Sequence, residues 1–105
     1  MADFMKILQQ AQEMQGKFQA IQQDLQAQTV TASAGGGMVT VEANGQGTIR
    51  SIKIDPSVVN ASDVEMLEDL VLVAVTEAQK KAQEIAQGEM GKLTGGLNLP
   101  FKLPF

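Results

Sequence analysis

Residues 35–82 read GGGMVTVEANGQGTIRSIKIDPSVVNASDVEMLEDLVLVAVTEAQKKA, and this stretch decides the fold. A glycine run precedes two segments that alternate apolar and polar residues. Asn44-Gly45 lies between them and is a strong signal for a hairpin turn. Asp55-Pro56 ends the second segment, because proline cannot donate a hydrogen bond to a sheet. The apolar pattern becomes helical after Asp63, so the stretch predicts a hairpin followed by a long helix.

Three antiparallel strands are expected, at residues 29–34, 38–43 and 48–54. In the third, Ile49 has the opposite parity to Ile52 and Ile54, so we expect a β-bulge or a sheet covered partly on both faces. The turn at residues 44–45 is expected to be type I′, because both residues tolerate positive φ, with Gly47 extending it as a bulge. A three-stranded meander needs a cover on one face, and the helices are the available material.

A first helix is expected from residue 3 to about residue 28. Its apolar residues recur at alternating spacings of three and four, which is an a/d heptad seam. The seam consists of Phe4, Ile7, Ala11, Met14, Phe18, Ile21 and Leu25. Such a stripe fits a helix that lies on its own core, but the strict 3.5-residue period favours packing against another helix.

The second helix is expected from Asp63 to about Gln87, with a capping box at residues 62–65 and stop signals at Gly88 and Gly91. Its first half is apolar around most of its circumference, so it should be buried on most sides. One three-stranded sheet covers one side, and a second copy of the chain is the economical cover for the rest. The residues expected in this homodimer interface are Met66, Leu70, Leu72 and Val73.

Both expected helices, at about 37 Å, overshoot strands of about 20 Å. We therefore expect the start of the first helix and the end of the second to pair antiparallel as a projecting arm. The expected organisation is one α+β dimerising domain at residues 1–91 and an apolar tail containing glycine and proline at residues 92–105. The tail is either a mobile terminus or an extended strap that docks Leu97, Leu99 and Phe101 on the arm or the partner.

The composition argues against catalysis. The chain of 105 residues has no Cys, His, Tyr or Trp, which removes the usual thiol nucleophile and the commonest general base. The carboxylates of Glu65, Glu68 and Asp69 complement the dipole of a helix start, so they do not argue for a metal site. We expect no enzyme activity, no cofactor and no metal. No apolar run is long enough to span a membrane, so a soluble cytoplasmic protein is expected.

The net charge of −4 gives no overall attraction to nucleic acid, so any DNA contact must depend on a local patch of cations. Lysines gather on the expected arms, including the half of the second helix that is expected to project. Arg50 and Lys53 form a smaller patch on the third strand. Exposed lysines are either a solvated face or a phosphate-binding surface, and the pattern alone leaves both open. The candidate DNA-binding residues are Lys6, Lys17, Lys80, Lys81 and Lys92.

Five segments carry a resemblance to a known family. They are residues 36–41 (GGMVTV), 44–47 (NGQG), 51–56 (SIKIDP), 63–70 (DVEMLEDL) and 91–100 (GKLTGGLNLP). Together they resemble the YbaB/EbfC family of bacterial nucleoid-associated proteins over nearly the whole chain. The resemblance implies an α-β-β-β-α protomer, a tweezer-like homodimer, and binding of duplex DNA in the cytoplasmic nucleoid. Protruding helical regions meet the DNA in that family, which by position points to the five candidate lysines.

The resulting hypothesis is a homodimeric DNA-binding protein of low sequence specificity that alters DNA conformation and gene expression. It has neither a membrane partner nor a small-molecule substrate, and glutamine side chains act as neutral hydrogen-bond donors beside the lysines. The alternative hypothesis is a protein-interaction adaptor that uses the helical arms and the apolar tail.

Overall fold

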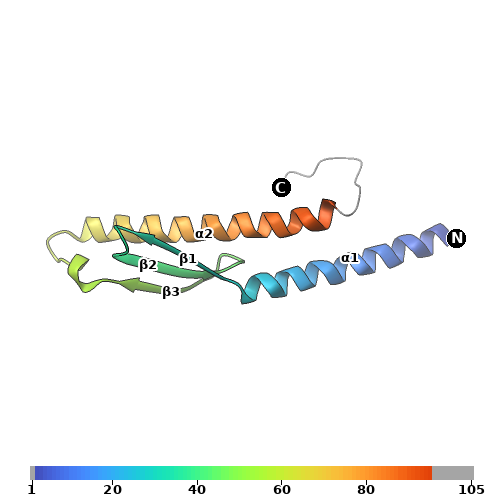
Figure 1. Cartoon of the computed structure of the whole chain (residues 1–105), viewed down its shortest axis with the longest axis horizontal. Coiled ribbons are helices and arrows are strands. Elements are labelled where there is room, and N and C mark those ends of the chain that lie inside the picture. Colours follow the sequence, from blue (N-terminus) through green and yellow to red (C-terminus); the bar gives the residue numbers. More distant parts are fainter. Residues whose placement is uncertain (1, 96–105) are drawn as a thin grey trace.

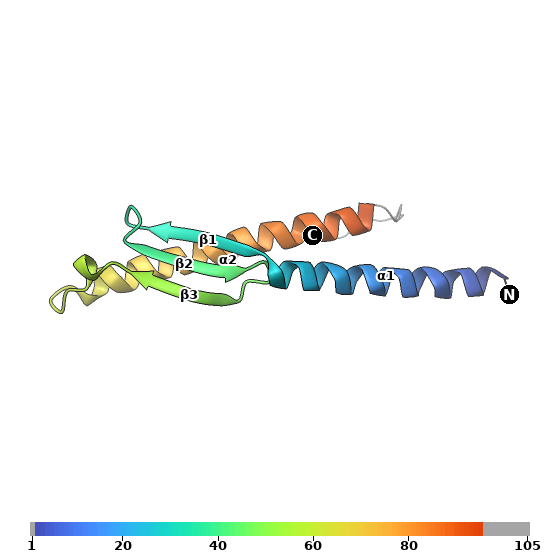
Figure 2. The same cartoon turned by 60° about the horizontal axis from the view of Figure 1, so that its bottom comes forward.

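The computed structural model describes residues 2–95 (Figure 1). Its elements are α1 (Ala2–Ala27), β1 (Thr29–Ala34), β2 (Val39–Asn44), β3 (Ile49–Ile54), the 3₁₀ helix η1 (Pro56–Val58) and α2 (Val64–Gly95). The predicted α+β protomer of α-β-β-β-α order is confirmed. The predictions for the tail beyond residue 95 lie outside the described residues. The molecule is 72 Å long, because both helices run past the same end of the sheet (Figure 2).

The three strands form an antiparallel meander in the order β1-β2-β3. The register between β2 and β3 passes over Arg50. As a result Ala43 opposes Ile49 while Val41 opposes Ile52, and both isoleucines lie on one face of the sheet. The predicted bulge is therefore confirmed, and it explains the change of parity in the third strand.

The β2–β3 hairpin is not the type I′ turn that the sequence predicted. A type I′ turn at residues 44–45 needs a positive φ at both residues, and Gly45 does not have one. The positive φ, of 87°, occurs at Gly47 instead. The N–H of Gly47 donates to the carbonyl of Asn44 over 3.0 Å, which makes a turn followed by a glycine bulge. Gly45 serves a tertiary contact instead. Its N–H donates to the carbonyl of Leu25 over 2.7 Å, and a Cβ on Gly45 would lie 2.8 Å from that oxygen.

α2 packs across β1 and β2, where Ala74 and Ala78 are fully buried against residues such as Val41. These small side chains let the helix lie close to the sheet. A helix is about 10 Å wide and strands lie about 4.8 Å apart, so one helix covers two strands. The helix therefore does not cover β3. Ile52 and Ile54 face the helix side of the sheet but remain 44% and 39% exposed.

Both helical segments after the sheet begin at an aspartate cap. The N–H of Ser57 donates to Asp55 Oδ1 over 2.8 Å at the start of η1, and this bond holds the pKa of that carboxyl below its ordinary value. The N–H of Met66 donates to Asp63 Oδ1 over 3.2 Å at the start of α2. The capping box predicted at Ser62 was therefore wrong by one residue, because Ser62 is bonded within the preceding turn.

α2 continues well beyond the predicted end. It passes through Gly88 and Gly91 and runs to Gly95, so the predicted stop near Gln87 was wrong. A glycine inside a helix costs about 1 kcal/mol relative to alanine, which weakens a helix without ending it. The helix therefore crosses the expected boundary between domain and tail at residue 91.

α1 is anchored at its C-terminal end, where Leu25 is 1% exposed and its carbonyl is bonded to Gly45. Farther out, Phe4 and Ile7 are each 61% exposed. The predicted pairing of the two helix ends is therefore wrong. Both ends extend beyond the same end of the sheet, but they project as separate arms (Figures 1 and 2). We call residues 2–20 of α1 the first arm and residues 87–95 of α2 the second arm.

Candidate nucleic-acid interface

Charge is distributed unevenly along the long axis of the molecule. Residues 55–69 contain five acidic side chains and no basic one. They form the end that carries η1 and the start of α2, opposite the arms (Figure 1), and we call it the acidic end. The whole chain has a net charge of −4. Without these five negative charges, the remaining residues have a net charge of +1. A polyanion is therefore repelled from the acidic end and is better tolerated at the arms.

Three of the candidate lysines lie on the arms. Lys6 and Lys17 are exposed on the first arm, and Lys92 is exposed on the second. Lys92 Nζ lies 3.4 Å from Glu89 Oε1, but its side chain is 79% exposed. An exposed ion pair of this kind is worth about 0–1 kcal/mol, so it does not prevent the lysine from binding a phosphate.

The other two candidate lysines lie over the sheet, not on the projecting half of the helix as predicted. Lys81 Nζ donates to the carbonyl of Thr31 in β1 over 2.9 Å. The next residue, Ala82, is 1% exposed, so this part of α2 is still packed on the rest of the protein. Lys80 is exposed beside it. The structure thus places Lys80 and Lys81 apart from the three arm lysines.

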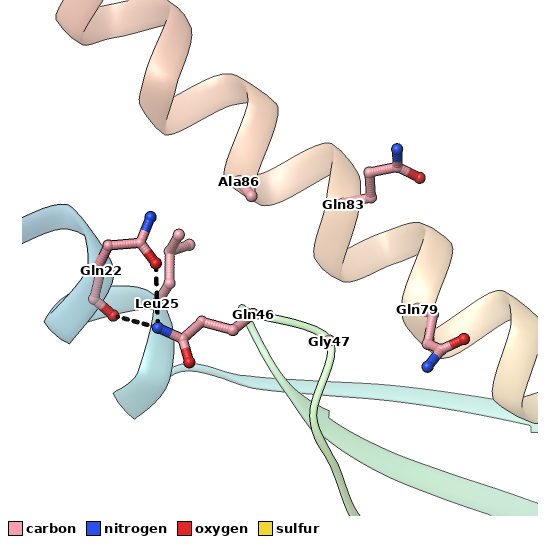
Figure 3. Close-up of a pocket in the computed structure, with 8 residues that line it drawn as sticks. Gln22, Leu25, Gln46, Gly47, Gln79, Gln83 and Ala86 are labelled. Atoms are coloured by element: carbon pink, nitrogen blue, oxygen red, sulfur yellow. Dashed lines mark hydrogen bonds between the residues drawn. The ribbon is translucent and has the colours of Figure 1, made fainter. Parts of the chain in front are cut away.

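A hollow of about 660 Å³ lies where the arms diverge (Figure 3). We call it the glutamine hollow, and it is lined by Gln22, Leu25, Gly45, Gln46, Gly47, Gln79, Gln83 and Ala86. Gln46 Nε2 donates to both the carbonyl and the Oε1 of Gln22, each over 3.1 Å. Gln79 and Gln83 line the hollow from α2, with their amide groups turned away from this pair (Figure 3). Amides are neutral and offer both donors and acceptors, so the hollow suits polar groups without selecting a charge.

Two apolar surfaces flank α2, and the predicted dimer residues divide between them. On one side, Met66, Leu70 and Val73 line a hollow of about 360 Å³ together with three carboxylates, those of Asp63, Glu65 and Asp69. Leu72 lies on the other side, in a hollow of about 500 Å³ next to β3. We call the second surface the β3 trough; it is lined by Ile54, Leu67, Glu68, Val71, Leu72 and Val75.

The sequence did not lead us to expect that β3 forms part of the β3 trough. Ile54 lines the β3 trough, and Ile52 on the same strand face is also exposed. The available signal was the bulge, which places both isoleucines on the helix side, combined with the width of a single helix. The glutamine hollow was also missed, because its lining comes from three distant parts of the chain.

The described part of the chain shows no sign of a metal or membrane site. Within residues 2–95, no group of three acidic side chains is arranged to hold a metal ion. Neither of the two long helices there is apolar enough over a sufficient length to cross a bilayer.

The chain matches known proteins over nearly its whole length. Residues 1–97 match the model of the YbaB/EbfC DNA-binding family. A nucleoid-associated protein of Gemmatimonas aurantiaca is 52% identical, over 98% of this chain and 99% of its own. Another, from Thermodesulfovibrio yellowstonii, is 57% identical over 92% and 85%.

A solved structure supports the fold. The crystal structure of an uncharacterized protein from Helicobacter pylori has a TM-score of 0.80 to this chain, covering 87% of it and 96% of the other, at 23% identity. That similarity concerns the fold alone. The match to the family model and the relatives at about 50% identity go further: this chain belongs to the YbaB/EbfC DNA-binding family.

Proposed function

We propose that the protein binds duplex DNA as a homodimer with low sequence specificity, through Lys6, Lys17 and Lys92 on its arms. The observation that carries this proposal is the charge distribution: the acidic end repels a polyanion, and the opposite end presents exposed lysines. The family match and the relatives named nucleoid-associated proteins support it, and they favour a location on the nucleoid.

Low specificity follows from the type of contact. Lysines bind phosphates, which are the same at every base step, so they position a protein on DNA without reading its sequence. The described residues of the arms contain no arginine, whose bidentate contact with guanine is the commonest specific one. Lys80 and Lys81 lie nearer the sheet and do not line the glutamine hollow, so they are left out of the proposed arm contact. DNA that reaches the base of the arms would contact the glutamine hollow.

The homodimer is proposed because of the β3 trough. Leu72 is 64% exposed, and the neighbouring Ile52 and Ile54 are 44% and 39% exposed. Contiguous apolar surface of this kind marks an interaction site on a soluble protein. A two-fold dimer buries the same surface on both copies. It would also present two sets of arms, and so double every lysine contact.

The experiment is a salt series of duplex DNA binding by the wild-type protein and by a Lys6→Ala/Lys17→Ala/Lys92→Ala variant. Three lysines in two copies give at most six phosphate contacts, so the slope of log K against log salt should become shallower by up to about 5 units. Lys53→Ala is the matched control, since Lys53 is an exposed lysine on β3 outside the arms. If the triple variant and the control have the same slope, the arm lysines are not the phosphate-binding site.

A further inference from the structure

The first arm has an apolar stripe that the described chain does not cover. Phe4, Ile7 and Phe18 are 61%, 61% and 43% exposed, and Leu8 beside them is 44% exposed. These residues belong to the heptad seam that ends at Leu25, or lie next to it. Large side chains repeated over several turns form a contiguous apolar surface, which soluble proteins rarely leave open.

The direction of this stripe follows from its buried end. Leu25 lines the glutamine hollow together with Gln83 and Ala86 of α2, so the seam faces α2 at that point. A heptad period keeps its members on one side of a helix. The seam from Phe4 to Phe18 therefore looks into the space between the two arms. A covering segment must enter that space.

The last ten residues of the sequence have the pattern of such a segment. Every odd-numbered position is apolar: Leu97, Leu99, Phe101, Leu103 and Phe105. Pro100 and Pro104 exclude a helix and hold the residue before each of them in an extended conformation. In an extended chain alternate side chains share one face, so all five apolar groups can lie on the same side.

The ten residues after Gly95 are also long enough to reach along the stripe, and they begin level with it. α2 ends at Gly95, level with the middle of α1 in both views (Figures 1 and 2). Ten extended residues reach about 33 Å. The stripe from Phe4 to Phe18 covers fourteen helical steps, or about 21 Å. The ten residues can therefore cross from the second arm and run along most of the stripe.

We propose that residues 97–105 dock as an extended strap on the apolar seam of the first arm of the same chain, between Phe4 and Phe18. A tethered segment is present at an effective concentration on the order of millimolar. At micromolar protein, the segment thus has about a thousandfold advantage over the same segment of a chain outside the proposed dimer. Polyanionic DNA does not compete for an apolar surface. The strap joins the two arms and so determines how far apart they stand.

A disulfide experiment tests the docking directly, because the 105-residue sequence contains no cysteine. Gln15→Cys lies seven residues before Gln22, so it shares the side of α1 that faces the glutamine hollow. Gln9→Cys lies on the opposite side of the same helix. Each is combined with Leu103→Cys, which lies on the apolar face of the strap that would contact the helix, and oxidised in the absence of DNA. The strap predicts an intrachain disulfide with residue 15 in more than tenfold excess over residue 9; equal yields at the two positions would overturn it.

A second comparison separates docking from chance collision and identifies the chain that supplies the strap. Leu99→Ser/Phe101→Ser removes two of the apolar groups and should lower the yield of the residue 15 disulfide more than tenfold. In the same variant, amide hydrogen exchange should become faster in residues 4–14 and stay unchanged in β2. Unchanged exchange in both segments would contradict the proposal. So would a disulfide that forms mainly between two differently tagged chains. Neither measurement involves DNA, so failure here leaves the proposed function standing.

Discussion

Replacing Leu72 with alanine should weaken the proposed dimer while leaving the fold of each protomer almost intact. Leu72 is 64% exposed in the single chain, so it contributes little to the core of its own protomer. It lines the β3 trough beside Ile54, where a second copy would cover it. The effect of the substitution should therefore appear in association and not in folding.

The magnitude follows from the exposed fraction. Burying a whole leucine side chain is worth about 1.5–3 kcal/mol, and burying the remaining 64% is worth about 1–2 kcal/mol per copy. Two-fold symmetry doubles this to about 2–4 kcal/mol. Since 1.4 kcal/mol is a factor of ten, the dissociation constant should rise about 30- to 700-fold.

Sedimentation equilibrium over a dilution series measures that constant for the wild type and the variant. Met5→Ala is the matched control, because Met5 is 65% exposed but lies on α1, away from the β3 trough. The control should leave the dissociation constant within about threefold of the wild type. If Leu72→Ala dimerises as tightly as Met5→Ala, or if the wild type stays monomeric at tens of micromolar, the β3 trough is not the interface.

Gly45→Ala should lower the unfolding free energy by about 1–3 kcal/mol, because the new Cβ would lie 2.8 Å from the carbonyl oxygen of Leu25. Gly88→Ala, at a helical position with nothing within 4 Å of the new Cβ, should raise it by about 1 kcal/mol; urea titration measures both, and a destabilised Gly88→Ala would refute the argument. Asp55→Asn should lower stability at pH 7 and lower it less at pH 3. A carboxyl with a depressed folded pKa stabilises above its unfolded pKa of about 3.9 and loses that contribution as the pH falls through the folded value. Urea midpoints that differ equally at pH 7 and pH 3 would exclude this role for the bond from Ser57.

The sequence predicted the elements whose signals are local. Alternation located the strands, and the parity of Ile49 revealed the bulge at Arg50. Predictions failed where a distant contact decided the structure. The residue pair at 44–45 suits a type I′ turn by itself, but the N–H of Gly45 is bonded to the carbonyl of Leu25 at the end of α1. No local pattern could reveal that contact, because its two partners are twenty residues apart.

The candidate site was predicted less well than the fold, for the same reason. Helix periodicity identifies which residues share a face, but it does not fix where a helix leaves the sheet. Lys80 and Lys81 were expected beyond that point, and the bond from Lys81 to Thr31 places them before it. The position at which each helix leaves the sheet did not affect the placement of the other three lysines. Those residues, Lys6, Lys17 and Lys92, lie on the first and second arms.

The anchorage of α1 at one end has a mechanical consequence. The helix of 26 residues is about 39 Å long, and within residues 2–95 it is held at its C-terminal end by the contact between Leu25 and Gly45 and by the bonds from Gln46 to Gln22. It therefore behaves as a lever with its pivot at the hairpin turn. A rotation of only 10° at the pivot moves the tip by about 7 Å, which exceeds the height of one helical turn. Small adjustments at residues 25 and 45 are thus amplified at the far end of the lever, and the separation between spin labels at the two tips would report on them.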